Sequence, residues 1–211
     1  MKNDSPPMPK SPAQHPRNAA QTKERILKAA RELFSHGTYE SVGTRDIAAQ
    51  AGVNATLINR YFGSKKKLFA EVVEDMGNPN APYRVGQSSK DMMDQAVKGI
   101  LEDGMESPLM VELRIILLSA LNPQVSDIIA NWFEKRRQRL IENLPGESPA
   151  SRADLIFSFP MGLAIILKLL RNNSSHPIDT GFIKKYLDNI LGELFGQQES
   201  DLPAKGTGKQ R

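Results

Sequence analysis

The chain has 211 residues, of which 39% are hydrophobic, enough to bury the core of one large domain or of a small domain and a larger one. It contains no cysteine, which excludes a disulfide scaffold, a thiolate zinc site and a cysteine nucleophile. The formal net charge of +4 is mildly basic, so the placement of the charges is more informative than their sum.

Polar segments flank the part of the chain that has helical periodicity. Residues 1–20 and 197–211 are poor in apolar residues, and we expect both to be disordered tails. The first of them lacks the apolar stretch of a signal peptide. The most membrane-like segment, residues 155–170, is shorter than a membrane span and contains Pro160 and Lys168. We interpret it as a buried helix and expect a soluble, cytoplasmic protein with no membrane partner.

Residues 21–76 have the apolar period of four helices, and no alternating pattern typical of a strand is present. The first helix is expected over about 21–35, before Gly37 ends it. The next three are each expected to begin at a residue whose side chain accepts a hydrogen bond from the first turn. These residues are Thr44, Asn54 and Ser64. Gly52 is expected to end the second helix.

Beyond a break at residues 77–89 the predicted helices are longer. One is expected over about 90–104, and Asp179 is expected to begin the last. Three more starts are predicted where a capping residue precedes a proline, because proline suits the first helical position. These pairs are Ser107-Pro108, Asn122-Pro123 and Ser148-Pro149. The sequence therefore predicts an all-α protein with a helical domain at 21–76 and a larger one at 77–196.

The spacing around Gly52 is that of a helix-turn-helix. Ala48 is small enough for two helices to approach closely, Gly52 supplies the turn, and Ile58 fills the shared core. The third helix then has an outward face of residues that lie three and four positions apart. These are Ala55, Thr56, Asn59 and Arg60. Asparagine can pair with adenine, arginine with guanine, and the threonine methyl group can contact thymine.

Three consecutive lysines, residues 65–67, are expected in the first turn of the fourth helix. Cations there oppose the helix dipole by a few tenths of a kcal/mol each. This cost is understandable if the ammonium groups and free amides bind a phosphate, and the alternative is a merely solvated helix start. Residues 44–67 carry five basic side chains and one acidic side chain, whereas residues 77–196 carry 13 basic and 14 acidic ones. We interpret the segment as a DNA-binding surface.

Residues 22–76, with "RDIAAQAGV", "YF" and "SKKKLF" at these spacings, resemble the N-terminal DNA-binding domain of the TetR/AcrR family of transcriptional regulators. The resemblance implies contacts to DNA bases or backbone from the starts of the second and third helices, and phosphate contacts from Tyr61 and Lys65. Tyr61 could equally be a core residue with an exposed hydroxyl group. The predicted DNA-binding residues are Thr44, Arg45, Asn54, Ala55, Thr56, Asn59, Arg60, Tyr61, Lys65 and Lys66. The sequence departs from the family pattern at Leu57 and Asn59, which affects the base code.

The same resemblance implies that the larger domain binds a ligand and dimerises through its last two helices. The last helix has an apolar stripe too wide for a single neighbour, which also favours a self-complementary interface. The predicted interface residues are Phe157, Leu163, Leu167, Ile183, Leu187, Ile190, Leu191 and Leu194. The candidate pocket residues, which could also be ordinary core, are Met93, Met110, Arg114, Trp132, Phe157 and Met161.

No nucleophile–base pair or metal-ligand spacing is evident, so we expect neither an enzyme nor a bound cofactor or metal. The sequence favours a homodimeric DNA-binding regulator, a repressor that a largely apolar small molecule releases from a palindromic operator. The alternative is a DNA-bound protein that recruits a protein partner and needs no small-molecule inducer. A large closed apolar cavity favours the first function, and a packed body with an exposed apolar patch favours the second.

Overall fold

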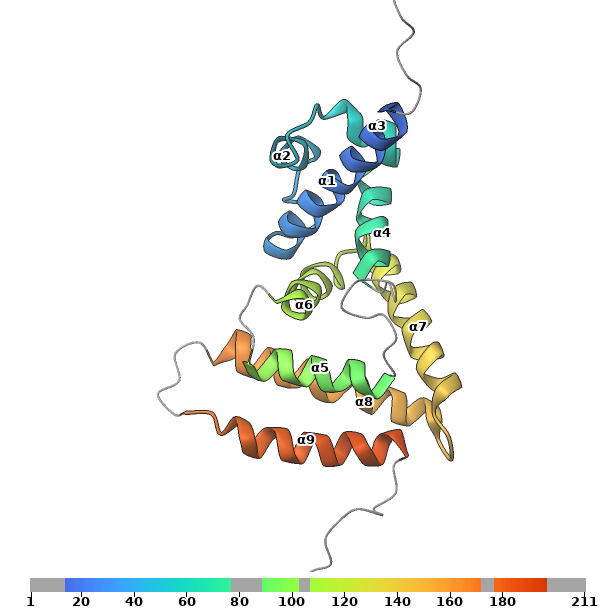
Figure 1. Ribbon diagram of the computed structural model, residues 1–211, viewed down its shortest axis with the longest axis vertical. Helices are drawn as coiled ribbons and strands as arrows, with labels where there is room; N and C mark the ends of the chain where they lie inside the picture. The colour runs from blue at the N-terminus through green and yellow to red at the C-terminus, as the bar shows by residue number, and fades with distance from the viewer. Residues whose placement is uncertain (1–13, 77–88, 103–106, 172–176, 197–211) are drawn as a thin grey trace, which may run out of the picture. The chain divides into compact units, whose positions relative to one another are not determined.

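The computed structural model describes residues 14–76, 89–102, 107–171 and 177–196, and every regular element within these ranges is a helix (Figure 1). The prediction of an all-α fold is confirmed. The helices are α1 Gln14–His36, α2 Thr44–Gln50, α3 Thr56–Phe62, α4 Lys65–Met76, α5 Ser89–Glu102, α6 Pro108–Ser119, α7 Ser126–Asn143, α8 Pro149–Ala164, the π-helical η1 Ile165–Leu170, and α9 Thr180–Phe195.

The described helices divide into two units. The N-terminal unit consists of α1 to α4 together with residues 114–129, and the C-terminal unit contains α5, residues 107–113 and the described chain from residue 130 onward. The sequence-based division placed the whole of 77–196 in one domain. In the structure α6 and α7 each contribute one part to each unit, because residues 114–129 pack with the first four helices.

The core of the N-terminal unit forms where α1 packs against α2 and α4, and α3 packs against α4. Ile26 and Phe34 of α1, Ile58 of α3 and Phe69 of α4 are fully buried. The Phe34 ring contacts Phe69 edge-on, with 5.0 Å between the ring centres. The apolar side of α4 is buried through Leu68, Phe69, Val72, Val73 and Met76. This core holds α2 and α3 in place.

The first helix begins earlier than the sequence predicted. It starts at Gln14 rather than near residue 21, although Pro16 lies in its first turn. Proline is tolerated there because the amides of the first turn have no intrahelical acceptor. Because residues 14–20 are polar, the sequence did not reveal that the first helix already begins there.

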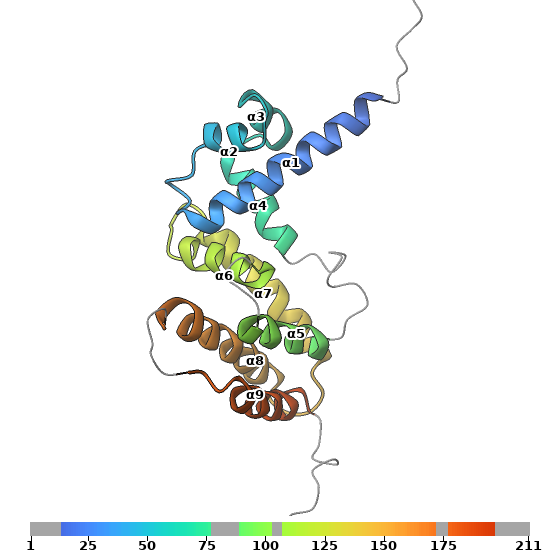
Figure 2. The ribbon, with the colours of Figure 1, turned by 60° about the vertical axis from the view of Figure 1, so that its left-hand side comes forward.

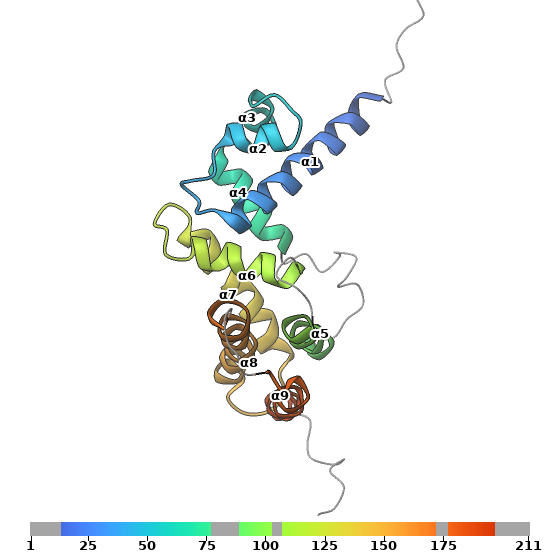
Figure 3. The same cartoon turned by 90° about the vertical axis from the view of Figure 1, so that its left-hand side faces the viewer.

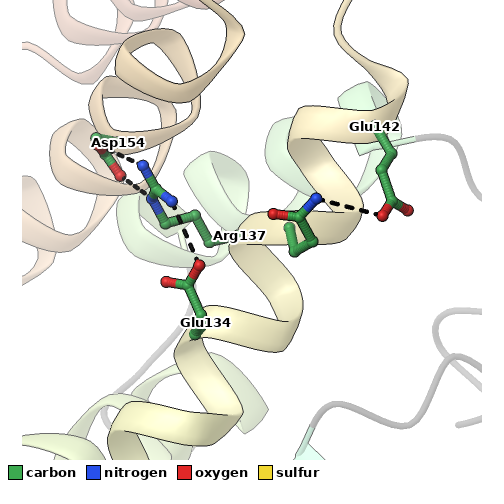
Figure 4. A network of polar contacts seen from close by, with 5 residues as sticks. Glu134, Arg137, Glu142 and Asp154 are labelled. Atoms are coloured by element: carbon green, nitrogen blue, oxygen red, sulfur yellow. Dashed lines mark hydrogen bonds and ion pairs between the residues drawn. The ribbon is translucent and has the colours of Figure 1, made fainter.

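In the C-terminal unit α5, α8 and α9 pack against one another, and the axes of α5 and α9 point toward the viewer in Figure 3. Their core contains the buried residues Val97, Leu140, Leu144, Ala153, Ile156, Leu187 and Leu191. A second cluster joins α5, α6 and α8 through Ile100, Met110, Leu113 and Ala164. An ion pair between Arg137 of α7 and Asp154 of α8 links α7 to α8 (Figure 4).

Four starts in this part of the chain were predicted from a capping residue, and three of them agree with the structure. Pro108 and Pro149 are the first residues of α6 and α8, and the Asp179 carboxylate accepts a hydrogen bond from the Phe182 amide at 2.8 Å. The exception is α7, which begins at Ser126. Asn122 instead caps a separate turn, accepting a hydrogen bond from the Gln124 amide at 2.9 Å.

The apolar segment at 155–170 is less buried than the sequence predicted. Pro149–Leu170 is the described helical stretch whose length and composition would allow it to cross a membrane, and 22% of its most apolar window is buried. Leu155, Phe159, Ile166 and Leu170 are exposed. This stretch packs with α5 and α9 (Figure 2), and because it is apolar nearly all round, those two helices leave apolar side chains exposed.

Candidate nucleic-acid interface

The start of α2 depends on Gly43 and Asp46. The Gly43 amide donates a hydrogen bond to Asp46 Oδ2 at 3.1 Å, so the carboxylate closes the first turn from inside the helix. Gly43, not Thr44, is the capping position, which corrects the sequence-based assignment. Thr44 is the first helical residue and is half-buried, and Arg45 after it is exposed.

The turn between α2 and α3 requires a glycine. Gly52 has a φ of +63°, in the left-handed region, and a Cβ added there would meet no atom within 4 Å. The cost of a side chain is therefore backbone strain rather than a clash. The Val53 amide donates to the Ala48 carbonyl oxygen at 2.9 Å, which fixes the turn. Ala48 and Ile58 are both buried, as expected for the shared core of a helix-turn-helix.

Asn54 organises the beginning of α3. Its Oδ1 accepts hydrogen bonds from the Thr56 amide at 2.9 Å and from the Thr56 hydroxyl group at 2.8 Å. Ala55, not Asn54, is the capping position, so Asn54 binds the first turn from one residue before that position, and its side-chain oxygen is occupied. Any contact from Asn54 to DNA is left to its Nδ2 group, which can only donate. The Thr56 hydroxyl group is likewise oriented, with its methyl group available for apolar contact.

The outer face of α3 is polar and its inner face is buried. Asn59 and Arg60 are exposed together with Thr56, whereas Ile58 and Phe62 lie in the core. Ala55 and Tyr61 are half-buried. A short helix that presents an amide, a guanidinium and a threonine on one exposed side has the donors and acceptors needed to read base edges.

The three lysines at the start of α4 have different surroundings. The Ser64 hydroxyl oxygen accepts a hydrogen bond from the Lys67 amide at 3.1 Å, so the predicted cap is present. Lys65 Nζ lies over the Tyr39 ring, 4.4 Å from its centre. Burial lowers the pKa of Lys65, and the nearby Glu40 carboxylate opposes that shift. Lys66 Nζ pairs with Asp127 Oδ2 at 3.2 Å.

Tyr39 and Asp127 are therefore part of this surface, and sequence reasoning did not include either. The Tyr39 ring is buried against Phe34 and Phe69, which fixes its place beneath Lys65. Asp127 is distant in sequence and reaches Lys66 from the first turn of α7. Only the "YE" after Gly37 could have suggested an aromatic support, whereas no local pattern indicates Asp127.

Residues 26–72 match the family model described as bacterial regulatory proteins of the tetR family. The matched range begins at the buried Ile26 of α1, ends at the buried Val72 of α4 and includes the whole helix-turn-helix. The helix-turn-helix part of this chain is therefore of the TetR-family type.

Curated relatives of this chain include an HTH-type transcriptional repressor of Mycobacterium tuberculosis (strain H37Rv) and an HTH-type transcriptional regulator of Mycobacterium bovis. Each is 32% identical over 72 residues, which cover 34% of this chain and 38% of the relative. The chain thus matches well under two thirds of the length of these relatives, so the likeness concerns one part of each protein.

Solved structures of similar fold cover more of the chain. NalD of Pseudomonas aeruginosa, the secondary repressor of the MexAB-OprM multidrug efflux pump, has a TM-score of 0.57 and 19% identity, over 84% of this chain and 96% of NalD. A transcriptional regulator of Saccharomonospora viridis in complex with choline has a TM-score of 0.56 and 19% identity, over 82% of this chain and 96% of that chain. At these identities the likeness shows a shared fold.

The structure distributes the candidate pocket residues over several places. Met110 and Met161 lie in or against the cluster that joins α5, α6 and α8, and Phe157 packs against the larger cluster and the Phe133 ring. Arg114 belongs to the N-terminal unit and Trp132 to the C-terminal unit. Met93 lies in α5, and its side chain falls outside the described residues. Two surface hollows, lined by Pro145, Gly146, Arg152, Glu193 and Gly196 and by Asn18, Gln21, Thr22, Glu24 and Arg25, involve other residues.

Two of the predicted interface residues are in the core of the chain itself. Leu187 and Leu191 are buried against α5, α7 and α8, so they are not available to a second copy, which corrects that assignment. The other predicted residues are half-buried, namely Phe157, Leu163, Leu167, Ile183, Ile190 and Leu194. On α9 the most exposed aromatic side chains are Phe182 and Tyr186, with 4.5 Å between their ring centres.

Proposed function

We propose that this chain is a sequence-specific DNA-binding transcriptional regulator, a homodimeric repressor that a small molecule releases from a palindromic operator. The observation that carries the proposal is the exposed polar face of α3 on a helix-turn-helix, followed directly by the lysine-rich start of α4. An enzymatic activity is not part of the proposal.

In this proposal α3 enters the major groove. Asn59 pairs with an adenine, Arg60 with a guanine, and the Thr56 methyl group contacts a thymine. Thr44 and Arg45 at the start of α2, with Tyr61 and Lys65, bind phosphates and fix the register on the duplex. Asn54 and Ala55 lie at the start of α3, where the backbone approaches the DNA. The exposure of Asn59 and Arg60 supports their assignment to bases.

Two observations support the proposed homodimer: one recognition helix can read only a few base pairs, and apolar side chains are exposed on the last helices. A single α3 reads only a few base pairs, and pairing two copies doubles the site. The half-sites then lie about one helical turn apart, roughly 34–36 Å. Support comes from the exposed apolar side chains of the last helices, including Phe159, Ile166, Phe182 and Tyr186. Such a surface on both copies can form a self-complementary interface.

Release by a ligand is supported by a solved structure of similar fold. The S. viridis regulator of similar fold has been solved in complex with choline, so a protein of this fold can bind a small organic molecule. In this chain we expect a largely apolar effector in the C-terminal unit. Binding of this effector changes the affinity for DNA only if it favours one arrangement of the two helix-turn-helix units of the dimer over another.

Recruitment of a protein partner is a second candidate, because part of the N-terminal unit exposes leucines. Leu117 and Leu118 of α6 are exposed, and Leu121 in the turn after α6 is 94% exposed. An apolar patch of this kind can dock another protein. The ligand and partner functions both use the same DNA-binding surface and differ in what regulates it.

The test of DNA binding begins with duplexes selected from random sequence by the full-length protein. Fluorescence anisotropy then measures affinity for the selected duplex and for its single-base variants. Asn59→Ala or Arg60→Ala should remove discrimination at one base pair per half-site, about 1–3 kcal/mol, with little effect elsewhere. The matched control, Lys184→Ala with Lys185→Ala on α9, removes two positive charges from the C-terminal unit and should leave the base preferences unchanged.

A protein that selects no duplex sequence would contradict the proposed function. If Asn59→Ala weakens binding equally for every duplex, Asn59 contacts the backbone and the base assignment is wrong.

A further inference from the structure

The start of α4 is linked to the start of α7 by one ion pair. Lys66 Nζ lies 3.2 Å from Asp127 Oδ2 and 3.3 Å from Asp127 Oδ1, so the ammonium group faces both carboxylate oxygens. Both residues belong to the N-terminal unit and both lie in the first turn of a helix. The pair therefore places an acidic group directly on a lysine of the proposed phosphate-binding surface.

The helix dipoles make the two partners unequal. Asp127 is stabilised by the positive end of α7, whereas Lys66 opposes the positive end of α4. The carboxylate is thus favoured in its place with or without Lys66, while the lysine gains from any nearby anion. Both side chains are about half exposed, and exposed pairs of this kind are weak. A DNA phosphate can therefore replace the carboxylate as the partner of Lys66.

We propose that Asp127 competes with the DNA phosphates for Lys66 and so lowers the affinity of this protein for DNA. The proposal rests on the proposed DNA-binding function and adds a residue outside the DNA-binding helices that controls it. While paired, Lys66 adds little net charge to the surface that meets the duplex. Release of the pair adds one phosphate contact.

The position of Asp127 gives this competition a route for regulation. Residues 126–129 of α7 belong to the N-terminal unit, and the rest of the same helix belongs to the C-terminal unit. A rotation of α7 about its axis, or a shift along that axis, would move the Asp127 carboxylate relative to Lys66. The strength of the ion pair, and with it the number of phosphate contacts, then depends on the state of a helix shared by both units.

The test is a double-mutant cycle on DNA binding. Affinities of the full-length wild type, Asp127→Asn, Lys66→Ala and the double variant for the selected duplex are measured between 50 and 200 mM NaCl. One added phosphate contact steepens the slope of log affinity against log salt by about 0.9. The advantage of Asp127→Asn over wild type should therefore shrink about 3.5-fold across this salt range. In the Lys66→Ala background the same substitution should have no effect.

Asp75→Asn is the matched control. Asp75 pairs with Arg31 at 3.2 Å near the other end of α4, and its loss should change neither affinity nor slope. Circular dichroism of each variant checks that the helices are retained.

Three results would overturn the inference. An unchanged affinity of Asp127→Asn shows that no competition occurs. An equal gain in the wild-type and Lys66→Ala backgrounds shows a general repulsion between Asp127 and DNA. A wild-type protein that binds no duplex removes the proposed function and this inference together, whereas the first two results leave the proposed function intact.

Discussion

The three adjacent lysines of α4 illustrate how much the surroundings of a residue decide its role. Lys65 lies over the Tyr39 ring, Lys66 pairs with Asp127, and the Lys67 backbone amide is bound by Ser64. A ring that is itself buried restricts the Lys65 side chain to a small region. Less side-chain entropy is then lost when Lys65 binds a phosphate, so it is the best prepared of the three for that contact.

If Lys65 binds a phosphate as proposed, its lowered pKa predicts that the affinity for DNA is sensitive to alkaline pH. A phosphate favours the charged lysine, so binding raises the pKa of this group and takes up a proton wherever the free protein has lost it. Affinity should therefore fall as the pH rises toward the lowered pKa of Lys65. Arginine stays charged throughout, so Lys65→Arg should retain affinity at a pH where the wild type has lost it.

Anisotropy titrations from neutral pH to about pH 10 measure this difference, with circular dichroism at each pH as the check on folding. Parallel curves for wild type and Lys65→Arg would show that Lys65 does not contribute to the pH dependence.

At the scale of helices, the sequence correctly predicted where a helix begins when a single side chain determines the first turn. Ser64 and Asp179 cap α4 and α9 because each has an acceptor that reaches an amide three residues ahead. The misassigned starts have several competing acceptors. Asp46 closes the first turn of α2 from inside the helix, and Asn122 satisfies a turn before α7 begins. Local sequence does not say which of two adequate arrangements packs better.

The turn at Gly52 gives a prediction about stability. A left-handed φ costs an ordinary residue about 1–2 kcal/mol, and no neighbouring atom adds a clash here. Gly52→Ala should lower the free energy of unfolding by about 1 kcal/mol or more. Asparagine tolerates this conformation better, so Gly52→Asn should lose less. Urea unfolding followed by circular dichroism compares the two, and equal losses would contradict the backbone explanation.

The ion pair between α7 and α8 gives a prediction about acid. Arg137 Nε donates to Asp154 Oδ1 at 2.5 Å, and this hydrogen bond lowers the pKa of Asp154 (Figure 4). A carboxyl group whose pKa is lower in the folded state stabilises the fold above its unfolded pKa, and this contribution disappears as the pH falls through the folded pKa. Asp154→Asn should therefore be less stable than wild type at neutral pH, and the difference should vanish in strong acid.

Urea unfolding at neutral pH and near pH 3 measures this difference. The matched control is Asp188→Asn, which removes a carboxylate paired with Lys184 within α9 alone. A difference between Asp154→Asn and wild type that stays constant with pH would show that the hydrogen bond does not set the acid dependence.

At the scale of the whole molecule, α9 shows what an apolar pattern leaves undecided. The sequence revealed that its stripe is too wide for one neighbour, but both halves of the stripe have the same helical period. In the structure Leu187 and Leu191, four residues apart, face the core of their own chain. Phe182 and Tyr186, also four apart, lie on the exposed side. Only the packing of α5 and α8 distinguishes these two faces.

The proposed homodimer is therefore best tested on the exposed face. Phe182→Glu with Tyr186→Glu should give a folded monomer, because two charges cannot be buried against a second copy at small cost. Light scattering coupled to size-exclusion chromatography measures the mass, and binding to the palindromic duplex should weaken strongly. Leu187→Glu is the contrasting variant: its charge enters the core of the single chain, so it should unfold or aggregate instead.

If the Phe182→Glu, Tyr186→Glu protein remains a dimer and keeps full affinity for the duplex, this side of α9 is not the interface. The exposed part of α8 and η1 would then be the next surface to test.

The packing of residues 114–129 with α1 to α4 has a consequence for exchanging parts between relatives. Ile115 and Val125 in this segment are fully buried, although the segment lies far from the DNA-binding helices in sequence. In a chimera that receives only residues 14–76 from another protein, Ile115 and Val125 would pack against the side chains of that other protein. We therefore expect an exchange of the DNA-binding helices to preserve the packing of Ile115 and Val125 only if residues 114–129 are exchanged with them.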